Sequence, residues 1–429
     1  MQIPKSLKIA TTLLALSVQG SFADTLQGTV LSGLAHSPEI LSYSLRNKAA
    51  WEAVRESRTV GGLNLSYGVN LGEDRTNSAM GTFGDIHINA VQPILDGGLS
   101  KSELRRSRST ANASDQRFLD TVNIFTLQIV QVYLEVLRLQ AALQIVRKDL
   151  KSQMDIAKRV QSRVASGVSS EADALQTNSE VESSRVQLYE IESQFETAID
   201  NYTLLTGKKP ESLQAVVAPV AALPTSIEHA IALASTQSPK IMAMRYDALA
   251  AAASADGIAS ANRAKLDLVA NATHNEIFKL GAKAGNEFSA QLRFSIPLYD
   301  GGASRSRTQQ ARLEAAAKRM DVQVAGRETE REMRATWNTI RHSKKRLVSL
   351  RAKLANEKKA LAINLKRYDA GLVNLDTLLN NRQSLTATQL SLLNADVEAR
   401  YNVFRVLGGT GQIIPGLAIK LSSRVALYE

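Results

Sequence analysis

The chain has 429 residues, of which 44% are hydrophobic, 22% are charged and 5% are aromatic. It contains no cysteine, which excludes a disulfide framework, cysteine-ligated zinc, iron–sulfur clusters, thiol catalysis and a lipid anchor on an N-terminal cysteine. The formal net charge of +11 is compatible with a nucleic-acid partner, so the compartment of the protein has to be established first.

The first 23 residues predict a secretory signal peptide. Lys5 and Lys8 supply its positive region, Ile9–Val18 its short apolar core, and Ser21 and Ala23 its small residues at the cleavage positions. Ten apolar residues are too few to cross about 30 Å of hydrocarbon, which disfavours a membrane anchor. The mature chain is therefore predicted to begin near residue 24, with a net charge of +9 and no nucleic-acid partner.

The nine prolines are unevenly spaced and predict very long helices. None lies between Ile94 and Lys209, and none lies between Leu298 and Ile414. An interior proline costs a helix about 3 kcal/mol, so each of these two long stretches is free to form continuous helix.

The sequence is an internal duplication with an offset of 204 residues. The segment 91–98 (VQPILDGG) recurs as 295–302 (SIPLYDGG), and at the same offset Tyr133 matches Trp337. The predicted division is a first repeat at 24–207, a proline-containing linker at 208–225, a second repeat at 226–409 and a C-terminal tail at 410–429.

Each repeat contains two stretches in which apolar and polar residues alternate, which predicts strands with one apolar and one polar face. The predicted strands lie at about 62–72, 83–94, 265–275 and 287–298, with a polar turn over Glu73–Gly81 between the first two. Strands of about 10 residues are long enough to cross an outer membrane when tilted. A soluble sandwich is the alternative, but four strands are too few for it, and exposed sheet edges are not tolerated in lipid. Several copies are therefore expected to contribute strands to one barrel.

The predicted helices are 26–59, 99–166 and 169–206 in the first repeat, and 303–370 and 373–407, after a first helix, in the second. The helix over 99–166 would be about 100 Å long. Its apolar residues recur at alternating spacings of three and four from Val122 to Leu150, as in a coiled coil. A fibrous coiled coil is the alternative reading, but it leaves the strands unexplained.

The sequence offers no catalytic or cofactor-binding pattern, and we expect no enzyme activity, no cofactor and no metal site. The five histidines are scattered, and none has a second ligand at helical or turn spacing. The glycine-rich segment Leu407–Gly411 lacks the third glycine and the flanking strand and helix of a nucleotide loop, so it is interpreted as a helix stop.

The signal peptide, the duplication and two repeated motifs together resemble the TolC family of outer-membrane efflux proteins, from residue 24 to about residue 411. The first motif is P-x-x-D-G-G at the strand-to-helix turns, and the second is R-x-x-x-G at the tips of the helix hairpins. Their residues are Pro93, Asp96, Gly97 and Gly98 with Pro297, Asp300, Gly301 and Gly302, and Arg163 and Gly167 with Arg367 and Gly371.

The resemblance implies a mainly α fold class with a transmembrane β-barrel. Three copies would each give four strands to one 12-stranded barrel, with a long α-helical tunnel in the periplasm. It also implies the outer membrane as the location, contact with outer-membrane lipid, and two kinds of partner. These are a periplasmic adaptor protein and an inner-membrane ABC or proton-driven exporter.

The resemblance further implies a periplasmic gate at the hairpin tips, formed by Asp173, Tyr368 and Asp376. Three copies of Asp376 would make a carboxylate ring that favours cations. Helix capping is the alternative, because Ser170-x-x-Asp173 is a capping-box pattern and Asn374 or Asp376 are ordinary N-caps. The chain also departs from the family pattern, since Val373 replaces a frequent arginine and Leu379 or Asn380 replaces a second inward aspartate.

The function expected from the sequence is an outer-membrane duct of a three-part export system. The missing cysteine disfavours the lipid-anchored branch of the family, which is typical of many drug-efflux ducts, and so favours type I protein secretion. The alternatives are a multidrug efflux duct of the same fold and an exported structural or adhesive coiled-coil protein without a pore.

Overall fold

The computed structural model describes residues 25–76, 79–278 and 285–419. The predicted signal peptide lies outside the described residues. In chain order the elements are α1 (Leu26–His36), α2 (Pro38–Ser57), β1 (Asn64–Thr76), β2 (Ala79–Leu95), α3 (Leu99–Ala165), α4 (Glu171–Thr206), a 3-10 turn (Val220–Ala222), α5 (Ile227–Gln237), α6 (Pro239–Ser260), β3 (Lys265–Phe278), β4 (Gly285–Ser295), α7 (Ala303–Asp369), α8 (Leu375–Gly409) and α9 (Ile413–Gly416).

The first predicted helix, 26–59, is wrong as one helix, because the structure breaks it at Ser37 into α1 and α2. Pro38 has no N–H and biases the preceding residue towards extended backbone, and Ser37 has φ −72° and ψ 118°. The Ser37 hydroxyl accepts a hydrogen bond from the Ile40 N–H and so caps the new helix. The same break separates α5 from α6 at Ser238.

β1, β2 and β3 extend further at their turn ends than their alternating patterns predict. β1 continues to Thr76 and β2 begins at Ala79, so the predicted polar turn over 73–81 lies largely within the two strands. The paired backbones of an antiparallel ladder satisfy each other's N–H and C=O groups, which allows polar residues to continue a strand past its apolar part. β3 likewise runs to Phe278. The predicted end of the fourth strand, at about residue 298, is wrong, because β4 covers Gly285–Ser295 and Pro297 has no N–H to continue the ladder.

The long helices α3 and α7 each contain 67 residues and span about 100 Å. The helices that follow them begin two residues later than the sequence predicts, because Ser170 and Asn374 act as N-caps. Among the described residues, α3 alone contains a stretch long and apolar enough to cross a membrane, but half of that stretch is buried inside the protein. The stretch is therefore part of the protein core.

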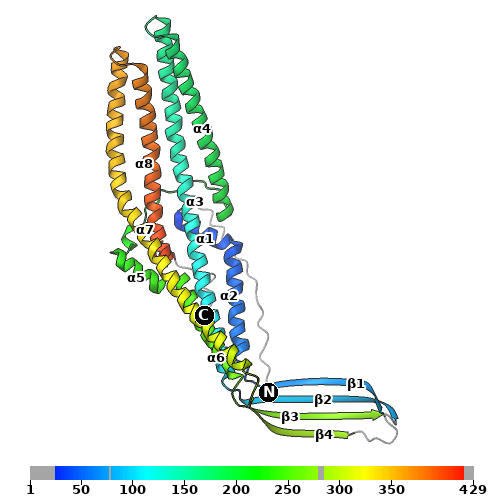
Figure 1. Cartoon of the computed structure of the whole chain (residues 1–429). Coiled ribbons are helices and arrows are strands. Elements are labelled where there is room, and N and C mark those ends of the chain that lie inside the picture. Colours follow the sequence, from blue (N-terminus) through cyan, green and yellow to red (C-terminus); the bar gives the residue numbers. More distant parts are fainter. Residues whose placement is uncertain (1–24, 77–78, 279–284, 420–429) are drawn as a thin grey trace.

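The helices form one layer, and different sets of helices make up its two ends (Figure 1). At the end far from the sheet the order is α4, α3, α8 and α7, and nearer the sheet it is α2, α3, α6 and α7. The two repeats therefore meet along α3, which packs against α6 and α8 of the second repeat. In both stretches α7 lies at one edge of the layer.

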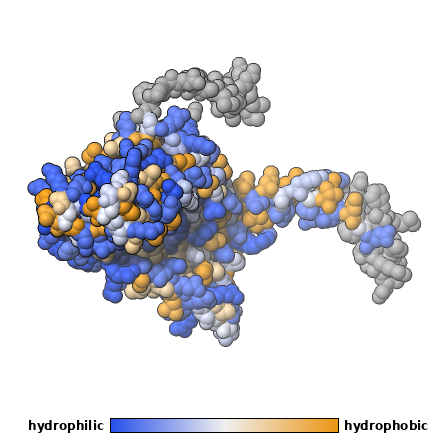
Figure 2. Space-filling view, turned by 90° about the horizontal axis from the view of Figure 1, so that it is seen from above, coloured by the Kyte–Doolittle hydropathy of each residue, from blue (hydrophilic) through white to orange (hydrophobic). Residues whose placement is uncertain are grey.

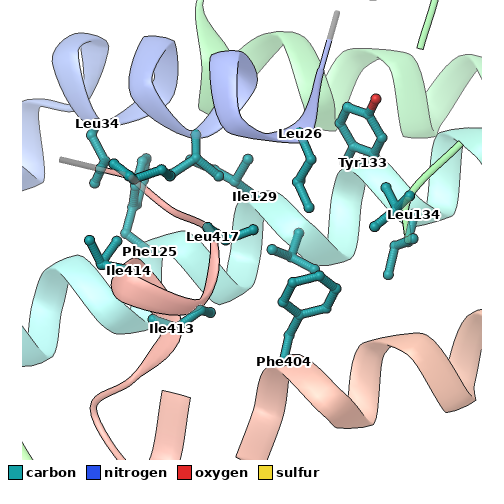
Figure 3. Packing of buried hydrophobic residues seen from close by; sticks show 14 of the residues in the cluster. Leu26, Leu34, Phe125, Ile129, Tyr133, Leu134, Phe404, Ile413, Ile414 and Leu417 are labelled. Carbon is teal, nitrogen blue, oxygen red and sulfur yellow. The ribbon is translucent and has the colours of Figure 1, made fainter. Parts of the chain in front are cut away.

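The main apolar core lies where these two stretches join (Figure 3). The coiled-coil seam predicted on α3 supplies its centre, and the chain end supplies an unexpected part. The predicted tail 410–429 contains α9. Ile413 and Ile414 of this helix, and Leu417 directly after it, are buried against α1, α3 and α8. The side-chain amide of Gln27 also donates to the Leu417 carbonyl at 2.7 Å. The described part of the C-terminal tail thus packs against the N-terminal helix α1.

Candidate functional site

The four strands form one antiparallel sheet in the order β1, β2, β3 and β4, which projects from one end of the helical layer (Figure 1). The central pairing, β2 with β3, joins the two repeats. Within the described residues, the outer edges of β1 and β4 have no partner strand. Each edge therefore presents a row of free backbone donors and acceptors, which can pair with a strand of another copy.

The register of the sheet separates an apolar face from a polar face. Tyr67, Ile88, Ala272 and Phe288 lie in one cross-strand row on the apolar face. One residue further along, Ser66, Asn89, Asn271 and Ser289 form a row on the polar face. The apolar side chains are open to the surroundings, with Tyr67 67% and Phe288 77% exposed, and hydrophobic residues line the projecting sheet in Figure 2. A sheet with these two uncovered faces suits lipid on one side and water on the other.

The polar face carries a small hydrogen-bonded group on β1 and β2. Asp85 accepts a hydrogen bond from the Asn70 amide at 3.2 Å, and the same carboxylate lies 2.9 Å from the His87 ring nitrogen Nδ1. The His87 ring lies over Gly68 on the neighbouring strand, where a Cβ atom would come within 2.4 Å of it. Gly68 thus leaves room for the histidine on this face.

The first strand-to-helix turn is fixed by Asp96, three residues before the first residue of α3. Its carboxylate accepts hydrogen bonds from the Gly98 N–H at 2.9 Å, the Ser100 N–H at 2.7 Å and the Ser100 hydroxyl. Burial raises the pKa of Asp96, but the hydrogen bonds from Ser100 and Gly98 together outweigh it and hold the pKa below its usual value. The stabilisation from this carboxylate is therefore present above pH about 4 and is lost as the pH falls below that.

The second turn repeats this geometry around Asp300. Its carboxylate accepts from the Gly302 N–H at 3.1 Å, the Ser304 N–H at 2.7 Å and the Ser304 hydroxyl. Hydrogen bonding to Ser304 also lowers the pKa of Asp300. In both turns two consecutive glycines have positive φ, which explains the repeated D-G-G of the sequence motif. Pro93 lies in β2, at an irregularity of its pairing with β3, and Pro297 follows the end of β4.

The helix hairpins end in two matching turns around Gly167 and Gly371, both with φ 73°. Arg163 joins them, because its guanidinium carbon lies 4.9 Å from the centre of the Tyr368 ring. The same guanidinium donates to the carbonyls of Tyr368 and Asp369 at 3.4 and 3.3 Å. Arg159 adds an ion pair with Asp369 at 3.3 Å. The tips of the two repeats are thus held together by arginines of α3, whereas the structure describes no such contact for Arg367.

The three predicted gate residues lie at these tips, and no hydrogen bond or ion pair joins them to one another among the described residues of the protomer. Asp173 forms the capping box, in which its carboxylate accepts from the Ser170 N–H at 3.1 Å. Asp376 accepts a hydrogen bond from the Gln176 amide at 2.7 Å, and Asn374 is the N-cap of α8. Tyr368 is 5% exposed, and its hydroxyl has no hydrogen-bond partner among the described residues.

Sequence reasoning missed a buried polar cluster that joins three helices. Asp149 on α3 accepts from the Arg382 Nε at 2.9 Å and the Thr386 hydroxyl at 2.6 Å, both on α8. Its other oxygen accepts from the Ser184 hydroxyl on α4 at 3.2 Å. The sequence around Lys148 and Asp149 contains no recognisable motif. The one signal that could have suggested the cluster is an aspartate within the apolar coiled-coil stretch of the long helix.

The family model for outer membrane efflux proteins matches the chain twice, over residues 32–208 and 230–406. The two matches reproduce the duplication and cover most of the chain. The chain belongs to the outer membrane efflux protein family. Proteins of this family are outer-membrane channels and not enzymes, so the chain is an outer-membrane efflux channel of a three-part export system. Channels of the TolC type are trimers that work with periplasmic adaptors and inner-membrane pumps.

The similarity extends over nearly the whole chain in sequence and in structure. The outer membrane efflux protein BepC of Brucella suis is 22% identical over 435 residues, covering 99% of this chain and 93% of BepC. TolC of Vibrio cholerae is 21% identical and covers 88% of each chain. The crystal structure of VceC from Vibrio cholerae superposes with a TM-score of 0.80 at 17% identity, over 92% of this chain and 97% of VceC.

Proposed function

We propose that this efflux channel is a homotrimer whose copies each contribute four strands to one 12-stranded barrel in the outer membrane. The sheet with its two exposed faces and two unpaired edges supports this assembly, because lipid requires a closed barrel. Helices of about 100 Å are far longer than the roughly 30 Å of hydrocarbon, so they would form a tunnel in the periplasm.

Planar-bilayer recording of the purified protein tests the duct. We expect discrete, long-lived channels, because a closed barrel continued by a helical tunnel encloses a water-filled path. An exported adhesive coiled-coil protein would add no conductance under the same conditions. Purified protein that inserts into the bilayer without conducting would contradict the proposal.

We infer that the cargo is protein, exported by type I secretion through a periplasmic adaptor and an inner-membrane ABC exporter. The supporting observation is the absence of cysteine from the sequence, which disfavours the lipid-anchored branch of the family. A multidrug efflux duct fed by a proton-driven exporter is the alternative. Deletion of the gene should abolish release of a specific protein into the medium and leave drug susceptibility within twofold. The reverse result would support the alternative.

We infer that the hairpin tips form the periplasmic gate, with Asp173, Tyr368 and Asp376 at its mouth. The contacts of Arg163 and Arg159 with the Tyr368–Asp369 segment support this, since they tie the tips of the two repeats together. The unpartnered, buried Tyr368 hydroxyl lies within the same group. In this proposal the gate opens when the two hairpins separate.

The carboxylate ring of the gate gives a direct prediction. Asp376→Ala should raise the concentration of a multivalent cation that half-blocks the channel at least tenfold, because three close carboxylates are removed from a narrow mouth. Half-block by hexaamminecobalt(III) in planar bilayers is the measurement. Asp321→Ala, which removes an exposed carboxylate of α7 about 70 Å from the tip, is the control and should leave the block unchanged.

A further inference from the structure

Basic residues occupy matching positions on the two long helices, just after each helix leaves the sheet. Lys101 and Arg108 on α3 recur 204 residues later as Arg305 and Arg312 on α7. All four side chains are exposed, and no ion pair joins them to another residue within the part of the chain that the structure describes. Each repeat thus presents two long cationic side chains that are free to meet a partner.

The four basic residues lie on the face of the long helices that smaller helices cover further along. Ile129 lies three heptads after Arg108 and packs against α1. Residues separated by whole heptads share one face of a supercoiled helix. In the second repeat Met333 lies three heptads after Arg312 and is buried with residues of α5. The basic residues therefore point to the side of the layer on which α1 and α5 lie.

This covered side of the layer forms the outside of the proposed tunnel. Gln131 lies about half a turn around α3 from Ile129 and is exposed, as is the matching Ala335 on α7. Among the described residues, one side of the layer thus carries further helices at this level, and the opposite side is open at these positions. A duct must keep its inner side open, so the four basic residues lie on its outer surface.

The residues that precede the turns mark the boundary of the membrane. Leu95 and Tyr299 occupy matching positions in the two repeats and are 50% and 89% exposed. They end the exposed apolar stretches that begin in β2 and β4, and aromatic residues flank the apolar band of outer-membrane barrels. Lys101 and Arg305 follow six residues later, so the first basic residues lie directly beyond the apolar band.

Helix geometry directs the four side chains back towards the membrane. Both long helices begin at the sheet (Figure 1), and the Cα–Cβ bonds of an α-helix are tilted towards its N-terminus. Lys101 and Arg305 lie about 3 Å from the starts of their helices, and Arg108 and Arg312 about 13 Å. The headgroup layer is about 5–8 Å thick. The first pair therefore lies at headgroup level, and the long side chains of the second pair can extend towards it.

We propose that these four residues bind the phosphate groups of anionic phospholipids in the periplasmic leaflet of the outer membrane. The inference rests on the assembly proposed above, because a closed trimer surrounds its barrel with three copies of this surface. A guanidinium donates two parallel hydrogen bonds to a phosphate, and a lysine ammonium supplies a compact charge. The site continues the lipid-facing surface of the sheet onto the first turns of α3 and α7.

The acidic residues near this surface leave most of its charge in place. Glu103 and Asp256 form ion pairs with other arginines of α3. The carboxylates of Asp96 and Asp300 each accept hydrogen bonds from their own turn. Glu56, at the end of α2, is exposed and offsets one of the four positive charges. The surface therefore keeps a positive balance that suits phosphate.

Spin-labelled lipids test the proposal on the assembled protein in phosphatidylcholine bilayers. Electron paramagnetic resonance gives the association constant of spin-labelled phosphatidylglycerol relative to that of spin-labelled phosphatidylcholine. We expect the natural protein to favour phosphatidylglycerol about threefold or more at low salt, and less at high salt, because salt screens exposed charges. Replacement of all four basic residues by glutamine should bring the ratio close to one. The substitutions are Lys101→Gln, Arg108→Gln, Arg305→Gln and Arg312→Gln.

A matched control removes four exposed charges from the far parts of the same two helices, about 60 Å or more from the sheet. This chain should keep the full preference for phosphatidylglycerol, because its lost charges lie outside the headgroup layer. The substitutions are Lys151→Gln, Lys158→Gln, Lys344→Gln and Lys358→Gln.

A comparison of two neighbouring arginines tests which side of the layer binds the lipid. Arg307 is exposed and lies about half a turn around α7 from Arg305, on the inner side of the proposed tunnel. Arg305→Gln should lower the preference for phosphatidylglycerol, whereas Arg307→Gln should leave it unchanged. Each variant changes one exposed arginine, so this comparison decides the question even if the four-substitution chain does not assemble.

Equal association of the two lipids with the natural protein would overturn the site, and so would an unchanged preference in the four-substitution chain. An equal loss with Arg307→Gln would also overturn it, because the charges would then act without regard to side. Lipid association is measured without any current, whereas the proposed duct fails if the natural protein does not conduct. The two failures are therefore distinguishable.

Discussion

At the residue scale, Gly97 and Gly301 occupy matching positions in the two turns and have nearly equal φ values of 68° and 69°. Their surroundings differ. A Cβ atom on Gly97 would come within 2.8 Å of the Arg263 Cβ and of the Ser260 carbonyl, whereas one on Gly301 would meet nothing within 4 Å. The Arg263 guanidinium also donates to the Gly97 carbonyl at 2.9 Å. The first turn is thus packed against the end of α6, and the second turn is open within the protomer.

This pair predicts two different costs for the same substitution. Gly301→Ala should destabilise the protein by about 1 kcal/mol, because only the backbone conformation is strained. Gly97→Ala should cost about 2 kcal/mol more, since α6 and Arg263 must also shift. Thermal unfolding followed by circular dichroism compares them. Equal losses would show that the packing around Gly97 adjusts freely.

The turn residues were predictable from sequence, but the contacts of the gate residues and the buried cluster were not. The repeated D-G-G marks a local backbone requirement, and local requirements leave a recognisable pattern. Asp149 and Arg382 are 233 positions apart, and they meet only because α3 and α8 pack together. Asp376 likewise contacts Gln176 of the other repeat, and no local pattern indicates that pairing.

At the scale of single elements, Ser37 and Ser238 each precede a proline that begins a helix. The Ser37 hydroxyl accepts a hydrogen bond from the Ile40 N–H at 3.3 Å, whereas the Ser238 side chain makes no capping hydrogen bond. The breaks themselves come from Pro38 and Pro239, so the hydroxyl is an added feature of the first break only.

Ser37→Ala should therefore lower the free energy of unfolding by about 1 kcal/mol, the usual value of an N-cap. Ser238→Ala is the control and should lie within about 0.5 kcal/mol of the natural protein. Urea denaturation followed by helical circular dichroism measures both. A loss of similar size in the two variants would mean that burial of the serines, and not capping, is what stabilises the protein.

The long helices were predictable because apolar periodicity and the absence of proline act over many turns. The break in the first helix was not anticipated, although Pro38 was visible, because proline is also compatible with the first turn of a continuing helix. The ends of the first and third strands were placed too early, since alternation ends before the backbone pairing does. The end of the fourth strand was placed too late, because alternation continues past Ser295 to Pro297.

At the scale of the whole molecule, α9 packs the C-terminal part of the chain against its N-terminal helix. Ile413 is fully buried and Leu417 is 6% exposed, so both contribute to the main core. This role could not be predicted from the sequence, because a short apolar segment after a glycine-rich helix stop has no helical periodicity. The core therefore depends on residues from both ends of the chain.

Leu417→Ala should destabilise the protein by about 3 kcal/mol, as expected for a buried leucine that leaves a cavity. Val217→Ala is the control, because this side chain is 90% exposed, and it should have little effect. Thermal unfolding in detergent gives the comparison. If Leu417→Ala unfolds like the control, the C-terminal segment is not part of the cooperative core.

The two long helices have the same length but very different surroundings, with 23 buried residues on α3 and eight on α7. A newly exported copy can therefore complete its own core around α3 while α7 still lies open to the periplasm. In the proposed assembly, α7 is therefore where a solitary copy and an assembled copy would differ.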